Sequence, residues 1–522
     1  MESKKLSFNM KMVGRDVLRN WPVWALTTLG YLLCITGFYS LFSYHGSTEE
    51  SIAGDIITLM MGVTEFASIG LGFVAALVAF GYLGSKRKHY MYEVLPMNRT
   101  SMFFTRFLLG FIVMSIPSVI IYVVEIIQVS AKTGHSLIGP LSAWLLINTA
   151  QNLFWLAFGT LFMVICGRKL MAGILYAAFS VVGLAFEYTL AIFNSIMFIG
   201  YGSSLSDADV FHIGILSPIE YMFTCGMGIR QREYVGLEGY FGVINLLTVF
   251  IAAIVLIVLG FILYKKRRAE RTDDNIVFNG AKTVCAVIFT VVFAVEGMLV
   301  LLGLFIYRSE GISHFAGIRM VIVLLIICLS IAGYLIACMI IEKKLKVFKK
   351  KYLVKACIIS AVLTLFTVLY IHDVFGIEKK VPETEELAAA WVSGQQIVAK
   401  TAHNYNYEDT YSTEEELKAI TGLHQIIVDN MDELIEVYDS IDWSIYIRDT
   451  SDYSNYDVYH QKVYPVDSCR IYIDYILKNG RNYYKNYYIK PEGSLFEKIK
   501  AYVNKYPDIF QKGKMNGSYY FE

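Results

Sequence analysis

The sequence predicts a polytopic α-helical membrane protein with about nine transmembrane helices, followed by a C-terminal extracellular α+β domain. Its mean hydropathy is +0.49, and 56% of its residues are hydrophobic while only 17% are charged. That balance is far more apolar than in ordinary globular proteins. The apolar residues also form runs of roughly twenty, the length that a helix needs to cross the hydrocarbon core. Because backbone polar groups in lipid must be satisfied within the segment, we expect these runs to be helices.

Nine such runs are separated by charged segments. They cover residues 22–42, 63–83, 103–128, 143–165, 171–199, 240–264, 283–307, 318–341 and 353–371. The 21 residues before the first run include five basic residues, and no small-residue cleavage site follows it. We therefore expect a first membrane span rather than a secretory signal peptide.

The distribution of lysine and arginine predicts the orientation of the chain. If the N-terminus is cytoplasmic, 25 of the 30 basic residues before His372 fall in inner segments and five in outer loops. Such a bias matches the positive-inside rule. We therefore expect a multi-pass protein of the cell membrane with a cytoplasmic N-terminus and an extracellular C-terminal domain.

Changes in composition divide the chain into four predicted parts. Residues 1–21 form an amphipathic interfacial helix, 22–268 a six-span core, 269–371 three additional spans and 372–522 the extracellular domain. The outer stretch between the fifth and sixth spans contains an apolar segment, 213–222, which is too short to cross the membrane. A re-entrant or interfacial helix is expected there.

The C-terminal domain carries both helix and strand signals. Residues 412–415 (Ser-Thr-Glu-Glu) predict a capping box that opens a helix through about Val437. Residues 469–477 alternate with period two, Asn479 and Gly480 predict a tight turn, and 481–490 form the second strand of a hairpin. A closing helix is expected over 494–506.

The chain lacks the motifs of common catalytic and cofactor sites. It contains no P-loop, no H-E-x-x-H, no paired C-x-x-C and no G-x-S-x-G. We therefore expect no catalytic residue, metal site or cofactor within this chain. The basic residues line the predicted inner face, so membrane lipids are a better partner for them than nucleic acid. Cys225 and Cys469 are the two cysteines expected outside, and two free thiols are more consistent with the pattern than a disulfide.

Acidic residues within the predicted spans are the candidate translocation path. Glu65, Glu125 and Glu187 lie at a similar outer depth, and ionisable groups in a membrane are costly unless they face a cavity or a partner. One interpretation is a shared polar chamber. The other is that each carboxylate reaches the outer interface independently, and this second interpretation suits Glu65 best.

The loop over residues 85–99 is the most informative segment for function. It is too charged for lipid, and it contains the ordered run Tyr92-Glu93-Val94-Leu95-Pro96-Met97-Asn98-Arg99. This run resembles the glutamate–leucine–proline–arginine signature that follows the second span in ABC-2 type transporter permeases. The amphipathic N-terminal helix, the six spans, the outer Leu216-Ser217-Pro218 segment and the stop at residues 264–267 are similar to that family as well. The resemblance covers roughly residues 1–270, and the three extra spans with the external domain resemble a bacterial subset of the family.

The resemblance implies a permease subunit of an ABC exporter. ATP and Mg would be used by a separate ATPase subunit, and a second permease, identical or a sister chain, would complete the pore. The ATPase-coupling loop would involve Lys88, Tyr92, Glu93, Leu95, Pro96 and Arg99. An apolar path with few charges fits export of an amphiphile such as a peptide, drug or lipid.

Two other classes of function remain open from the sequence. A non-transporting receptor or immunity protein would use the external domain to bind a ligand, although nine spans are more than an anchor needs. A membrane-embedded enzyme is disfavoured by the missing catalytic constellation.

Overall fold

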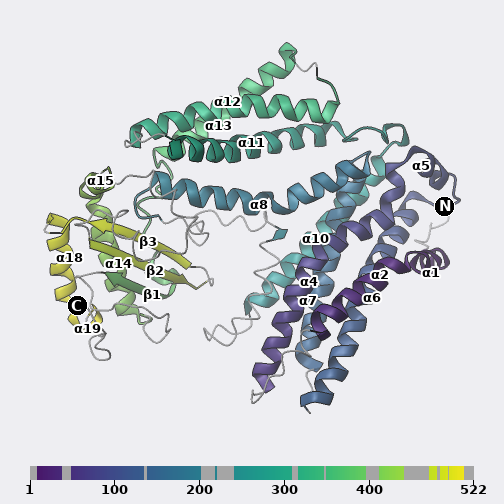
Figure 1. Ribbon diagram of the computed structural model, residues 1–522, viewed down its shortest axis with the longest axis horizontal. Helices are drawn as coiled ribbons and strands as arrows, with labels where there is room; N and C mark the ends of the chain where they lie inside the picture. The colour runs from purple at the N-terminus through teal and green to yellow at the C-terminus, as the bar shows by residue number, and fades with distance from the viewer. Residues whose placement is uncertain are drawn as a thin grey trace, which may run out of the picture. The chain divides into compact units, whose positions relative to one another are not determined.

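The computed structural model describes residues 9–37, 49–133, 138–201, 218–219, 240–308, 315–345, 348–394, 411–439, 469–478, 482–491 and 493–510 (Figure 1). Within these residues, eight helices are long and apolar enough to cross a membrane. They are α4 (Glu49–Phe80), α6 (Arg99–Thr133), α7 (Ile138–Ile165), α8 (Lys169–Met197), α10 (Tyr240–Lys266), α11 (Asn279–Arg308), α12 (Phe315–Glu342) and α13 (Lys350–Ile371). These helices correspond to the second to ninth predicted spans and confirm a multi-pass helical architecture.

The first predicted span is confirmed only in part. Helix α2 (Trp21–Tyr31) continues into a π-helical turn, η1 (Leu32–Gly37), and residues 38–42 lie outside the described chain. The described apolar helix Trp21–Gly37 is shorter than the eight others. The predicted helix over 213–222 also falls almost entirely outside the described residues.

The chain forms two compact units. One comprises Met1–Leu184, Gly214–Ala286 and Met339–Leu345, and the other comprises Ala185–Ile213, Val287–Cys338 and Lys346–Glu522. The four predicted parts, 1–21, 22–268, 269–371 and 372–522, stay predictions.

Helix α7 is the central element of the first unit, where it packs against α4, α10 and α6. Helices α4 and α7 approach closely at Gly72 of α4, because a Cβ atom there would lie 2.5 Å from Cβ of Trp155 in α7. A glycine at this position lets the two backbones meet, as small residues do between membrane helices. The amphipathic helix α1 (Met10–Arg19) packs against α6 and begins at Asn9, whose side chain accepts a hydrogen bond from Met12 N–H.

A buried polar seam joins α4, α6 and α7 in the middle of this helix group. Ser68 donates to Asn152 Oδ1 at 3.0 Å, and Ser118 donates to Asn148 Oδ1 at 2.6 Å. Asn152 Nδ2 also donates to Asn148 Oδ1 at 3.0 Å. Hydrogen bonds of this kind fix neighbouring membrane helices in register, typically at about 0.6 to 2 kcal/mol each.

In the second unit, the end of α8 packs with α11, α12 and α13. The shared core includes Met197, Leu302, Ile322 and Tyr370. Tyr370 donates to Asn194 Oδ1 at 2.5 Å, which joins α13 to α8. The loop after α13 turns at Asp373 and leads through the short turn η6 (Thr384–Glu386) into an α+β fold.

That fold contains a three-stranded antiparallel sheet in the order β1-β2-β3. Strands β2 (Cys469–Leu477) and β3 (Asn482–Ile489) pair from Cys469 with Ile489 to Ile476 with Asn482, which confirms the predicted hairpin. The turn at 479–481 lies outside the described residues. Strand β1 (Leu387–Gly394), which pairs with β2, was not predicted.

Helices cover the sheet and complete an apolar core. They are α14 (Glu414–Asp429), α15 (Met431–Asp439), α18 (Ser494–Lys505) and the short α19 (Pro507–Phe510). The capping box lies one residue later than predicted. The Thr413 hydroxyl oxygen accepts from Glu416 N–H, and the Glu416 carboxylate accepts from Thr413 N–H. The single predicted helix is interrupted at Asn430, and the predicted closing helix is confirmed as α18.

Candidate functional site

The predicted coupling loop folds into a short helix between α4 and α6. A 3₁₀ turn, η2 (Gly81–Gly84), ends α4, and extended Ser85 starts α5 (Lys86–Glu93). Pro96 is the third residue after α5 ends at Glu93. Because a proline disfavours helical geometry in the residue before it, the chain turns at Leu95 and restarts as α6 at Arg99.

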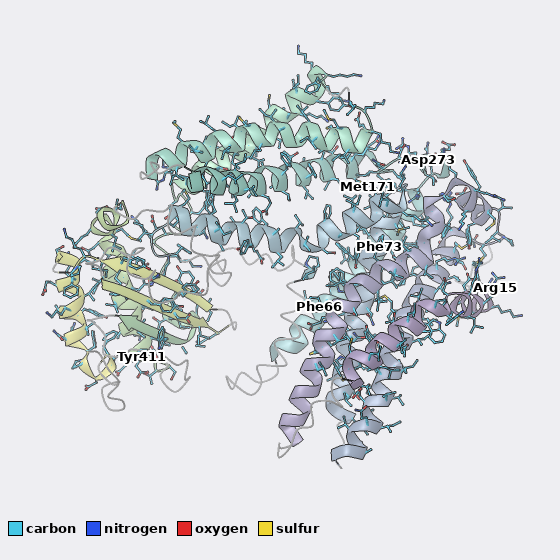
Figure 2. All side chains as sticks on the ribbon, viewed as in Figure 1. Arg15, Phe66, Phe73, Met171, Asp273 and Tyr411 are labelled. Carbon is cyan, nitrogen blue, oxygen red and sulfur yellow. The ribbon has the colours of Figure 1, made fainter. Side chains whose placement is uncertain are left out.

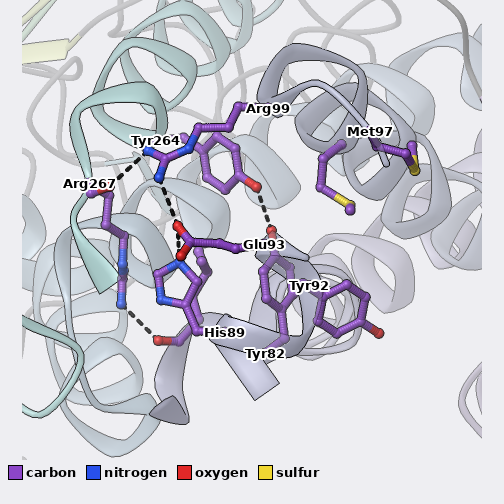
Figure 3. A pocket seen from close by; sticks show the side chains of 10 residues that line it. Tyr82, His89, Tyr92, Glu93, Met97, Arg99, Tyr264 and Arg267 are labelled. Atoms are coloured by element: carbon purple, nitrogen blue, oxygen red, sulfur yellow. Dashed lines mark hydrogen bonds and ion pairs between the residues drawn. The ribbon is translucent and has the colours of Figure 1, made fainter. Parts of the chain in front are cut away.

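Arg99 holds the two ends of this loop together. Its guanidinium donates to Glu93 Oε1 at 2.7 Å and to the carbonyl oxygen of Arg267 at 3.0 Å (Figure 3). It also donates to the carbonyl oxygen of Lys265 at 3.1 Å. These carbonyls lie at and just beyond the C-terminus of α10, where helix carbonyls lack internal partners and favour positive charge. Glu93 and Arg99, chosen from the sequence, therefore meet in one ion pair on α10.

Arg267 extends the same connection into the protein. Its side chain is 1% exposed and donates to the carbonyl oxygens of Met163, Val164 and Cys166 at the end of α7, at 2.6 to 2.9 Å. It also donates to Leu83 O in η2 at 2.8 Å. One guanidinium thus joins the ends of α4, α7 and α10 beside α5.

An aromatic cluster fixes the other side of α5. Tyr92 packs against Tyr82 in a tilted arrangement with ring centroids 4.4 Å apart, and the Tyr82 and Tyr264 hydroxyls are hydrogen-bonded at 2.7 Å. The guanidinium of Arg106 lies 4.6 Å from the Tyr92 ring and donates to Asp16 Oδ2 at 2.8 Å. Since Asp16 belongs to α1, the amphipathic helix joins the same cluster.

His89 is the titratable group at the centre of the loop. It is 5% exposed, its Nδ1 lies 3.1 Å from Thr272 Oγ1, and its Nε2 lies 3.7 Å from Glu93 Oε1. Burial lowers the pKa of His89 below its usual value, and the positive charges of Arg267 and Arg99 lower it further, while the negative charge of Glu93 acts in the opposite direction. The neutral imidazole is therefore the form that this site favours at neutral pH.

Lys86 adds an exposed ion pair to Asp273, which is labelled in Figure 2.

These residues surround a cavity of about 300 Å³. Its walls are formed by Tyr82, Leu83, His89, Tyr92, Glu93, Met97, Arg99, Met102, Tyr264 and Arg267 (Figure 3). Several polar groups in the wall bond to one another, as Tyr82 does to Tyr264 and Arg99 to Glu93.

The opposite face of the loop is exposed and mixes apolar and basic residues. Val94 is 83% exposed and Met91 61%, and Tyr90 and Leu95 are exposed beside them. Lys88 and Pro96 lie on this open side as well. The sequence-predicted residues therefore divide by role: Tyr92, Glu93 and Arg99 fix the loop to the helices, while Lys88, Leu95 and Pro96 remain accessible.

The candidate translocation residues are all buried. Glu125 of α6 accepts a hydrogen bond from Thr36 at 2.5 Å and is fully buried, and Glu65 of α4 is 3% exposed in the same unit. Glu187 of α8 is 4% exposed and belongs to the second unit, where Thr189 donates to Glu296 at 2.8 Å. A chamber shared by Glu65, Glu125 and Glu187 stays a prediction.

Several site residues were missed by sequence reasoning. Arg267 was counted as part of a basic stop, and Arg106 as one more inner charge, although both are buried among partners. Asp16 offered a signal, since an acidic residue in a basic amphipathic helix indicates a positively charged partner elsewhere in the chain. His89 offered none, because scattered histidines are usually surface residues.

Within the described ranges, no three His, Cys, Asp or Glu residues gather as a metal site would require. Comparisons of the chain with family models, with curated proteins and with solved structures give no match.

Proposed function

We propose that this chain is the membrane permease subunit of an ATP-driven exporter, in which α5 receives force from a separate ATPase subunit. The supporting observation is the two-sided construction of the loop. One side of α5 is joined to four membrane helices through Arg99, Arg267 and the tyrosine cluster, while the other presents exposed apolar residues.

This construction suits a lever. A docking helix can move membrane helices only if its connections to them are stiff enough to transmit its displacement. Apart from the ion pair between Arg99 and Glu93, the Arg99 and Arg267 bonds end on backbone carbonyls, so a displacement of Glu93 on α5 would be passed through Arg99 to the end of α10. Exposed apolar residues rimmed by charge are typical of protein interaction sites.

The proposal includes the partners that such a lever requires. ATP and Mg are used by the ATPase subunit, and this chain is not itself an enzyme. A second permease completes the pore, and an amphiphilic peptide, drug or lipid is exported from the cell. The loop faces the cytoplasm, and the C-terminal domain lies outside.

Substitution of Val94 tests the proposal directly. Val94→Asp places a charge on the exposed face without touching the Arg99 or Arg267 bonds, so the fold should persist while the ATPase subunit no longer co-purifies. Leu345→Asp is the matched control, since Leu345 is 82% exposed in another predicted inner loop. Unchanged recovery of an ATPase with Val94→Asp, or equal loss in both variants, would oppose the proposal.

A ligand-binding receptor or immunity protein is the second candidate, and a joint in the second unit favours it. After α8, Gly200 O accepts from Asn486 N–H of β3 at 2.9 Å, and Ile199 N–H donates to Glu378 Oε1 at 2.8 Å. Lys485 of β3 lies 3.5 Å from the Tyr201 ring centroid. The soluble fold is thus bonded to the ends of α8 and α13, as a sensor that reports to the membrane would be.

The same variant separates the two candidates. If the chain confers resistance to a toxic peptide or drug by export, Val94→Asp should abolish that resistance. If the soluble domain confers it by binding alone, resistance should survive the substitution at an equal level of protein in the membrane.

A further inference from the structure

Helix α13 carries a groove in which an apolar surface runs directly into a cluster of positive charge. The groove has a volume of about 520 Å³ and is lined by Lys350, Leu353, Val354, Cys357, Ile358 and Ala361. These positions repeat at three- and four-residue intervals, so they form one face of the helix. Its lining is apolar except at one end, where Lys350 lies.

The lysine end of the groove carries a concentrated positive charge. Lys349, Lys350 and Lys351 are all exposed, and the first turn of α13 contains no acidic residue. In the part of the chain that the structure describes, no carboxylate lies within ion-pair distance of these three lysines. Phe348, directly before them, is 69% exposed. Aromatic and basic residues together are typical of a membrane–water interface.

The lysines at one end of the groove argue for a lipid as its occupant, and the length of the groove fits one acyl chain. From Lys350 to Ala361 the helix rises about 16 Å at ~1.5 Å per residue. The hydrocarbon core is roughly 30 Å thick, so this distance corresponds to about one leaflet. A phospholipid with an acyl chain along this length of α13 places its phosphate at the interface, beside the three lysines.

We propose that this face of α13 is a binding site for an anionic phospholipid, with the headgroup at Lys349, Lys350 and Lys351 and one acyl chain in the groove over Leu353 to Ala361. The lysine bias of the sequence places this end in the inner leaflet. Clusters of lysine attract anionic headgroups more strongly than zwitterionic ones. The lysines therefore select the headgroup by its charge, and the apolar groove binds the acyl chain. This proposal does not rest on the coupling of α5 to an ATPase.

The test measures lipid preference in the groove itself. A fluorophore is attached to Cys357 of the full chain, with the other seven cysteines changed to serine, and the protein is reconstituted in bilayers of phosphatidylcholine and phosphatidylglycerol. Quenching by the brominated form of each lipid gives their relative association constant. We expect a preference for phosphatidylglycerol of about fivefold or more at low salt.

The variant Lys349→Gln, Lys350→Gln, Lys351→Gln should reduce that preference to nearly one, and the three arginine substitutions should keep it. The matched control removes three exposed lysines from the soluble domain, Lys490, Lys500 and Lys505, and should leave the preference unchanged. Equal quenching by both lipids in the unsubstituted groove, or retention of the preference in the glutamine variant, overturns the proposal.

Two other outcomes also count against a lipid site. If the outer-domain control loses the preference as fully as the glutamine variant, net charge rather than the groove selects the lipid. If the native chain oxidises to a dimer that Cys357→Ser abolishes, a second copy rather than a lipid covers this face.

Discussion

Arg267 links the ends of several helices in the first unit. Its guanidinium accounts for hydrogen bonds to four carbonyl oxygens from two other elements, and its own carbonyl accepts from Arg99. A buried arginine is costly to desolvate, and that cost lowers the pKa of Arg267 to about 10. The charge persists there because helix C-termini supply the negative ends of their dipoles.

Replacement of Arg267 by methionine should therefore destabilise the protein. The change keeps much of the apolar volume but leaves buried carbonyls without donors, and we expect a loss of about 2–4 kcal/mol in unfolding free energy. Denaturant titration in mild detergent measures it. Arg268→Met is the control, because Arg268 is exposed, and it should have an effect near zero. Similar losses in both variants would contradict this account of Arg267.

His89 should make the loop sensitive to acid. Its pKa in the folded protein lies below the usual value of about 6.5, so folding favours the neutral form. The resulting stabilisation is complete above that usual value and is lost as pH falls through the lowered pKa. The thermal midpoint of the native protein should thus fall more steeply between about pH 6.5 and pH 5 than that of His89→Asn. Parallel curves of thermal midpoint against pH for the two proteins would show that protonation of His89 is not coupled to folding.

Some of the loop could be predicted from sequence and some could not. Glu93, Leu95, Pro96 and Arg99 were chosen because their order along the chain resembles a family signature, and Lys88 because it lies in the same charged loop. Arg267 and Arg106 were not found as site residues, since a count of inner charges treats every arginine alike. What distinguishes them is burial, which depends on partners about 100 residues away in the chain for Arg267 and 90 for Arg106.

Among the secondary-structure elements, the α4–α7 contact determines how closely the first unit can pack. Gly72 faces the backbone of Trp155, and a Cβ atom added at Gly72 would lie 2.8 Å from the Trp155 carbonyl carbon. That approach brings Ser68, four residues earlier on α4, to its hydrogen bond with Asn152. The glycine and the polar seam therefore support each other.

Gly72→Ala should push α4 away from α7 and weaken the Ser68–Asn152 bond, at a cost of about 1–3 kcal/mol for overpacking. The matched control is Gly70→Ala in the same helix, since no atom lies within 4 Å of a Cβ there, and it should be neutral or slightly stabilising. Resistance to unfolding in sodium dodecyl sulfate measures both. Equal stability of the two variants would show that the crossing tolerates a side chain.

Prediction of the elements failed where tertiary contacts override local preference. Strand β1 reads Leu-Ala-Ala-Ala-Trp-Val-Ser-Gly, and its three alanines favour a helix over a strand. It is a strand because it pairs with β2 through residues such as Val392 with Ile473. Strands β2 and β3 were predictable because their alternation and the Asn-Gly turn are local signals. The capping box was displaced by one residue because Ser412, Thr413, Glu415 and Glu416 offer two overlapping versions of the same motif.

At the scale of the whole molecule, the apolar runs predicted the multi-pass architecture well. Eight of nine expected spans are long apolar helices among the described residues, because the bilayer permits little other than helix for such runs. The division of the chain into two compact units was not predictable, since it cuts through α8, α11 and α12 rather than between them. Orientation, partners and substrate stay predictions that the helices alone do not test.

Photo-cross-linking at Val94 tests the central claim most directly. Val94 is 83% exposed on the open side of the coupling loop, so a benzophenone side chain placed there in cells should capture what docks on α5. The account predicts one major adduct to a soluble protein that contains a P-loop, G-x-x-x-x-G-K-[ST], with a yield that changes when ATP is depleted. The same group at Leu345 should give no such adduct. No adduct at Val94, or an adduct only to proteins without a P-loop, would contradict the assignment of this loop as the site that receives force from an ATPase.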